Sequence, residues 1–161
     1  MAKRTVRTMD FPALVEVNRQ VVLLTGEPHE FLPADRQKLE GLLSEVEVRA
    51  DTQDPEEAVT EKASLLVFKL ASGQYFRAGN KRTALVAGLS FLRKNGWKIE
   101  IKDPEFVSLV DRAGVGAATL DDLYSAMSRL ITKGPTERKG WEGAVKTAIE
   151  SNRKFLTDLA T

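Results

Sequence analysis

The sequence predicts an all-α fold, a compact bundle of helices built as one domain. Apolar residues recur at helical spacing through most of the chain, and capping residues or prolines stand where several of these segments begin. One short stretch alternates as a strand does, and no internal repeat interrupts the pattern. With 161 residues, 42% of them hydrophobic, the chain is long enough for one sizeable core and short for two.

The first half of the chain predicts three helices and one connection. The expected helices span 11–24, 34–46 and 55–71. Asp10 is placed to cap the first of them, and Pro12 lies in its first turn, where the missing N–H does no harm. The charged stretch 47–55 is interpreted as a connection or a short extended flap. Because 63–71 is apolar nearly all round, we expect the third helix to be buried there.

The second half predicts four more helices and one extended segment. The expected helices span 82–95, 104–112, 120–131 and 141–159, with a strand or extended segment over 97–101. Thr119 is placed to cap the third of these helices. Glycine and proline after Lys133 indicate a boundary, so we expect a tail over 1–9, a helical domain over 10–133 and a C-terminal extension over 134–161. The last helix is amphipathic and is expected either to cover the domain's own apolar surface or to form a homo-oligomer or partner contact.

Charge and composition exclude several classes of function. The chain has 24 basic and 23 acidic residues, a formal charge of +1, so no general attraction to nucleic acid or to a membrane is expected. No apolar run approaches the roughly 20 residues of a membrane span, and the first residues lack the apolar core of a signal peptide. The absence of cysteine excludes disulfides and thiolate chemistry. We therefore expect a cytoplasmic protein with no membrane and no nucleic-acid partner.

The loop 74–83 reads Gln-Tyr-Phe-Arg-Ala-Gly-Asn-Lys-Arg-Thr and is suited to binding an anion. Gly79 lets backbone approach a ligand closely, and a helix that starts at Asn80 or Lys81 directs its unpaired first-turn N–H groups and positive dipole end to the same point. Lys81 and Arg82 add two mobile positive charges, and Arg82 can bind phosphate oxygens as a planar fork. Taken alone, these residues favour an ordinary turn and helix cap over an anion site.

The segment 71–97 changes that interpretation. It contains SGQYFRAGNKRTALVAGLSFLRKNGW and resembles the central segment of the Fic/Doc family, whose motif reads His-x-Phe-x-acid-(Gly/Ala)-Asn-(Gly/Lys)-Arg. Lys-Arg-Thr-Ala-Leu at 81–85 is more similar to the death-on-curing (Doc) branch, and a looser resemblance extends from about residue 11 to 130. The resemblance implies a compact Fic/Doc-like helical bundle in which Phe76 packs into the core and anchors the loop. It also implies that nucleotide phosphates are bound by Gly79, Asn80, Lys81 and Arg82.

Two positions depart from the family motif. Gln74 stands where the family has its catalytic histidine, and Ala78 stands where it has the acidic residue that helps to hold a metal ion. A glutamine amide can hydrogen-bond a hydroxyl but cannot accept its proton near neutral pH. Ala78 has no side-chain oxygen for Mg²⁺, which could then bind only through phosphates and water. Natural divergence and deliberate disarming of a toxic enzyme both fit this pair of replacements, and we favour divergence.

Three functions remain open. We rank first a catalytically degenerate protein that keeps the phosphate-binding loop and binds ATP or another nucleotide, a phosphorylated ligand or a protein. The second, implied by the resemblance, is an enzyme that transfers phosphate or AMP from ATP to a hydroxyl of a protein target, such as a translation factor, and that has an antitoxin as partner. The third is a helical interaction protein without nucleotide binding. His29 and the acidic cluster of Asp51, Asp54, Glu56 and Glu57 are expected to be solvated or capping residues, not a replacement base or a metal site.

Overall fold

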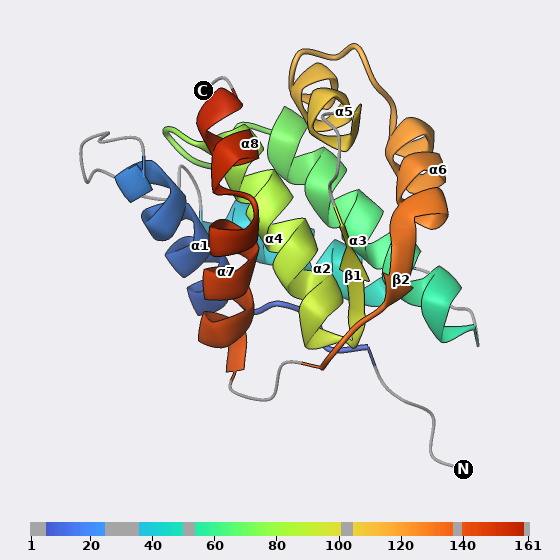
Figure 1. Ribbon diagram of the computed structural model, residues 1–161. Coiled ribbons are helices and arrows are strands. Elements are labelled where there is room, and N and C mark those ends of the chain that lie inside the picture. Colours follow the sequence, from blue (N-terminus) through green and yellow to red (C-terminus); the bar gives the residue numbers. More distant parts are fainter. Residues whose placement is uncertain (1–5, 25–35, 50–53, 101–104, 137–139, 160–161) are drawn as a thin grey trace.

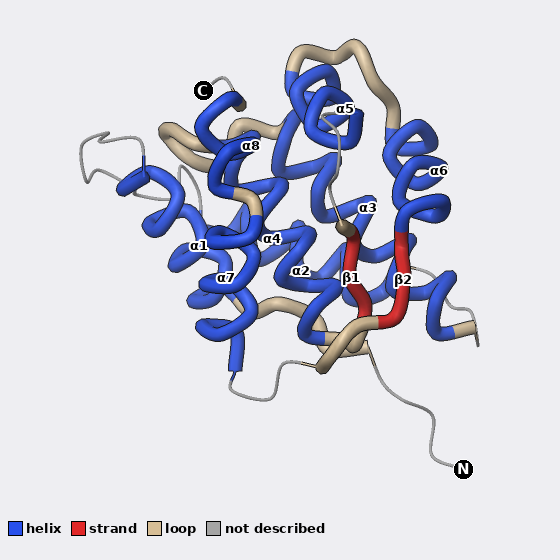
Figure 2. Tube along the Cα trace, in the orientation of Figure 1, coloured by secondary structure: helices blue, strands red, loops and turns tan. Residues whose placement is uncertain are grey.

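Residues 6–24, 36–49, 54–100, 105–136 and 140–159 are described by the structure, a computed structural model of the chain (Figure 1). They form eight helices and one small antiparallel sheet of two strands (Figure 2), which confirms the all-α prediction. The helices are α1 (Phe11–Leu24), α2 (Arg36–Val48), α3 (Pro55–Ser72), α4 (Asn80–Lys94), α5 (Glu105–Gly114), α6 (Leu120–Leu130), α7 (Gly140–Ser151) and α8 (Arg153–Asp158). The strands are β1 (Trp97–Ile99) and β2 (Ile131–Lys133).

Helix caps fix the starts of two helices where the sequence places them. The Asp10 carboxylate accepts a hydrogen bond from the Ala13 N–H at 2.9 Å, and α1 begins at the next residue after Asp10. Thr119 and Asp122 form a reciprocal capping box at the start of α6, with bonds of 3.1 and 2.9 Å. The hydrogen bond from the Thr119 backbone lowers the pKa of the Asp122 carboxyl, because it favours the charged form.

Helices α3 and α4 lie at the centre of the molecule (Figure 1). Every side chain from 82 to 92 in α4 is buried, as is most of 63–71 in α3, where the sequence predicts burial. Helix α3 also packs against α2, α5 and α6, while α1 and α7 pack against α4. The loop between α3 and α4, which contains the predicted site, is therefore held at both ends by the most deeply buried part of the core.

A glycine allows α3 and α4 to approach closely. A Cβ atom added to Gly88 would lie 2.3 Å from Cγ2 of Val67, a side chain that is 1% exposed. Gly88→Ala is therefore expected to lower the free energy of unfolding by about 1–2 kcal/mol, because overpacking outweighs the roughly 1 kcal/mol of helix propensity that alanine adds. Urea unfolding measures the change. Adding Val67→Ala removes the methyl groups in the way, so the double variant should lose less stability than the sum of the single changes, and simple additivity would contradict this packing account.

Two expected boundaries are wrong. The helix expected over 120–131 ends at Leu130, because Ile131 adopts extended backbone and pairs with Ile99 of β1. The segment 47–55 begins inside α2, whose last carbonyl groups at Val46 and Glu47 accept hydrogen bonds from Lys62 of α3. Burial lowers the pKa of the Lys62 ammonium from its ordinary value. Residues 50–53, the middle of the proposed flap, lie outside the described part of the chain.

The C-terminal helix expected over 141–159 is two helices. Helix α7 ends at Ser151, and the Asn152 side chain bonds back to the Ala148 carbonyl at 2.9 Å before α8 begins. Asparagine competes for backbone groups in this way and so interrupts helices. The apolar side of the extension packs onto its own chain, with these side chains buried: Ala144, Val145, Ala148, Ile149, Leu156 and Leu159. None of the described helices combines the length and the apolar character needed to cross a membrane.

Candidate functional site

The loop 73–79 joins the end of α3 to the start of α4 and packs against α1. Gly79 has φ +74°, in the left-handed region that favours glycine. A Cβ atom there would lie 3.1 Å from Cγ1 of Val22, so the close approach that Gly79 permits is to α1. Close approach of a ligand to the Gly79 backbone stays a prediction. Helix α4 begins at Asn80, one of the two starts expected from the loop and two residues before the expected 82–95 helix.

Two asparagine side chains hold the loop in shape. The Asn80 amide accepts a hydrogen bond from the Phe76 N–H at 2.9 Å and donates one to the Phe76 carbonyl at 2.8 Å, so it closes the loop on itself. Phe76 is 3% exposed and packs in the core, where the family resemblance places it. From α1, Asn18 donates to the Ala78 carbonyl at 2.9 Å and to the Thr83 hydroxyl at 3.0 Å. Both polar groups of the Asn80 side chain are therefore used within the loop, so a ligand at Asn80 can contact only its backbone.

The start of α4 presents backbone N–H groups. Among the described residues no side chain forms a capping hydrogen bond at Gly79, the N-cap of this helix. The N–H groups of a first helical turn carry the positive end of the helix dipole and bind anions well. Binding of an anion by these backbone groups stays a prediction.

The two cations of the motif are held by other side chains and backbone. Lys81 Nζ lies 2.8 Å from the Asp111 carboxylate of α5, and the Lys81 side chain is only 14% exposed. Arg82 is 7% exposed, and its Nε donates to the Leu156 carbonyl of α8 at 2.6 Å. The expectation that both charges are mobile is therefore wrong. The physical reason is that α5 and α8 return to the start of α4 and supply oxygen acceptors there.

The two positions that depart from the family motif differ in exposure. Gln74 is exposed and has φ +53°, the one positive φ of a described non-glycine residue. Ala78 is half-buried and contributes its carbonyl to Asn18. Burial, and to a smaller extent the Glu45 carboxylate, raise the pKa of the Tyr75 phenol above its ordinary value of 10.0. Tyr75 therefore stays protonated near neutral pH and is not a substitute base.

No replacement for the metal site is found in the part of the chain that the structure describes, where no group of three or more histidine, cysteine, aspartate or glutamate side chains could hold an ion. Asp54 accepts a hydrogen bond from the Glu56 N–H at 3.1 Å and caps α3, which is the capping role expected for the acidic cluster. His29 and Asp51 lie outside the described residues.

Sequence reasoning missed three residues that shape the loop. Asn18 could have been found from local sequence, since it is a polar residue on the buried face of α1. Asp111 could not have been found from local sequence, because its partner Lys81 is 30 positions earlier in the chain. Lys38 of α2 donates to the Gly73 carbonyl at 2.7 Å and lies 4.7 Å from the centre of the Tyr75 ring, so it fixes the first part of the loop.

Comparison with known proteins agrees with this geometry. Residues 7–92 match the sequence model of the Fic/DOC family, more than half of the chain. The chain belongs to the Fic/DOC family. It is also 30% identical over 97 residues to protein kinase doc of Escherichia phage P1, a match that covers 60% of this chain and 75% of the phage protein. The family match includes the loop and most of α4 of this Fic/Doc protein, and it ends before α5, α7 and α8.

Proposed function

We propose that this Fic/Doc protein binds the phosphates of a nucleotide at the loop 74–82 and does not transfer them efficiently. One observation carries the proposal: α4 begins after Gly79, which has no side chain to cap the first N–H groups, and the loop beside them has Gln74 and Ala78 in place of a base and a carboxylate. Binding an anion needs those N–H groups and nearby positive charge. Transfer needs in addition a group that accepts the proton of the attacking hydroxyl, and a glutamine amide does not.

Lys81 is the charge best placed to complete such a site. Its ammonium is held by Asp111, whose side chain is 44% exposed, so a phosphate can compete for the same ammonium. Arg82 supports the site from behind, through its bond to Leu156. The residues present do not fit a protein-held Mg²⁺, because the Ala78 side chain has no oxygen and the described residues hold no suitable cluster. Any Mg²⁺ would arrive with the phosphates.

A second function is favoured by a specific observation, the similarity to a phage protein whose name is protein kinase doc. In that case the chain transfers phosphate, or AMP as the wider family resemblance implies, to a protein hydroxyl, and a group other than Gln74 removes the proton. A translation factor as target and an antitoxin as partner belong to this proposal. Both proposals place the protein in the cytoplasm, where ATP is available. A homo-oligomer through the C-terminal helix is not favoured, because the apolar side of α7 is already buried.

Calorimetric titration with ATP, with and without magnesium, tests the binding proposal. Lys81→Ala is expected to weaken ATP binding about tenfold or more, because a hydrogen bond to a charged group is lost, and the effect should grow at low salt. Asp111→Asn is expected to tighten binding, because it releases the Lys81 ammonium. Lys133→Ala, an exposed lysine in β2, is the matched control and should leave affinity unchanged. Equal affinity in the four proteins, or no ATP binding by any of them, would contradict the proposal. The third function, a helical interaction protein without nucleotide binding, would then be left.

A further inference from the structure

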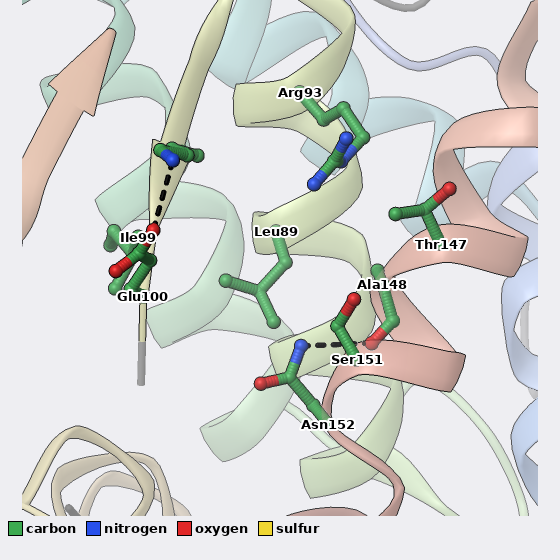
Figure 3. A pocket seen from close by; sticks show the side chains of 9 residues that line it. Leu89, Arg93, Ile99, Glu100, Thr147, Ala148, Ser151 and Asn152 are labelled. Atoms are coloured by element: carbon green, nitrogen blue, oxygen red, sulfur yellow. Dashed lines mark hydrogen bonds and ion pairs between the residues drawn. The ribbon is translucent and has the colours of Figure 1, made fainter. Parts of the chain in front are cut away.

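A polar cavity lies at the opposite end of α4 from the loop 74–83. It has a volume of about 310 Å³ and is enclosed by α4, the β1 strand with Glu100, and α7 (Figure 3). Arg93 lines it 13 positions after Asn80, which corresponds to about 20 Å along a helix. The cavity is therefore a separate place from the loop. Its volume is at the lower end of the range for small-molecule sites.

Arg93 is the residue that distinguishes this cavity. Its guanidinium extends into the space between β1 and α7 (Figure 3), and the side chain is half-buried. Within the described residues the guanidinium makes no hydrogen bond and no ion pair. An arginine carries five N–H donors in a fixed planar arrangement that matches phosphate and carboxylate oxygens. A half-buried arginine without an acceptor is thus suited to a ligand that supplies one.

The groups around Arg93 supply further donors from other directions. Lys98 reaches the cavity from β1, and its ammonium lies 2.9 Å from the Glu100 carboxylate. Ser151, at the end of α7, turns its hydroxyl toward the same space (Figure 3). Glu100 is 57% exposed and balances the charge of Lys98, so the positive charge in excess is that of Arg93. Leu89 and Ile99 form an apolar wall beside these polar groups.

We propose that this cavity binds the phosphate group of a small organic molecule whose apolar part packs against Leu89 and Ile99. The lining includes an arginine from α4, a lysine from β1 and a serine from α7, a set of donors that suits the several oxygens of a phosphate. A carboxylate has two oxygens in one plane and is satisfied by the guanidinium alone. The bound phosphate joins Arg93 of α4 to Ser151 of α7, and so fastens the C-terminal extension onto α4.

Phenyl phosphate is the probe for this site, with benzoate as the carboxylate that carries the same ring. In a titration of the full chain followed by ¹⁵N NMR, phenyl phosphate should shift the amide signals of residues 147–152 in a saturable way and bind more tightly than benzoate. Arg93→Gln should weaken binding tenfold or more, and Arg93→Lys less, because it keeps the charge and loses the fork. Glu100→Gln should tighten binding. Arg129→Gln removes an exposed arginine of α6 and is the control that should change nothing.

Several results would overturn the proposal. Shifts confined to residues 74–82 and unchanged in Arg93→Gln would assign the phosphate to the motif loop alone. Benzoate binding as tightly as phenyl phosphate would exclude the phosphate class, and the absence of saturable shifts near α7 would exclude a site there. Because Lys81→Ala acts on the loop and Arg93→Gln on this cavity, failure here and failure of the nucleotide-binding proposal are distinguished by which signals respond.

Discussion

Removal of the chain after Gly134 is expected to leave a protein that does not fold stably. Helices α7 and α8 bury several apolar side chains against the rest of the molecule, among them Val145, Ile149 and Leu156. Burial of each such side chain stabilises a protein by roughly 1.5–3 kcal/mol, and small domains have only about 5–15 kcal/mol in total. The truncation would also uncover the apolar surface of α4 and remove the Leu156 carbonyl from Arg82. The expected result is loss of the cooperative unfolding transition, together with aggregation.

Circular dichroism and size-exclusion chromatography test this expectation. Lys146→Ala, an exposed position on α7, is the control, since it keeps the extension and removes one charge. A truncated protein that stays monomeric and unfolds cooperatively would contradict the packing argument. It would show that residues 10–133 form a domain by themselves and that the extension serves a partner.

The sequence predicted those parts of the fold that local patterns determine. Helix α1 has the predicted bounds because Asp10, Pro12 and the spacing of its apolar residues all act within the helix. Helix α4 begins at Asn80, as the glycine before it indicates. The pairing of β2 with β1 could not be predicted from local sequence, since it joins residues 32 to 36 positions apart, from Ile99 with Ile131 to Trp97 with Lys133. The three residues of β2 continue the apolar and polar pattern of α6, which favours helix. Pairing with β1 outweighs that local preference.

In the candidate site too, local features were predicted and contacts between distant residues were not. The resemblance found the loop, its Gly79 turn and the two replaced positions, because all lie within one continuous segment. The oxygen atoms that hold Lys81 and Arg82 belong to Asp111 and Leu156, 30 and 74 positions away. Both lie beyond the residues that match the family. A spacing rule therefore identified which cations the loop contains, and the tertiary structure determined how each one is held.

If the replacement of the family's histidine and acidic residue by Gln74 and Ala78 makes the protein inactive, restoring both groups is expected to produce transfer activity. Gln74→His supplies a base at an exposed position whose φ of +53° histidine tolerates better than most residues, and Ala78→Asp supplies a carboxylate for Mg²⁺. Labelled ATP should then modify a protein target or the chain itself at a rate roughly 10²- to 10⁴-fold above the present protein, the usual contribution of a positioned base. The rate should rise with pH through about 6.5, because only neutral imidazole accepts a proton.

The matched control is Gln74→Ala with Ala78→Asp, which has the carboxylate without the base and should remain silent. If the restored variant binds ATP as the calorimetric titration measures and still transfers nothing, the two replacements do not account for the loss. The cause would then lie in the groups that hold the loop. Asp111→Asn in the restored background would test this, because a gain on releasing Lys81 would show that its ion pair, at 2.8 Å, withholds the charge that transfer needs.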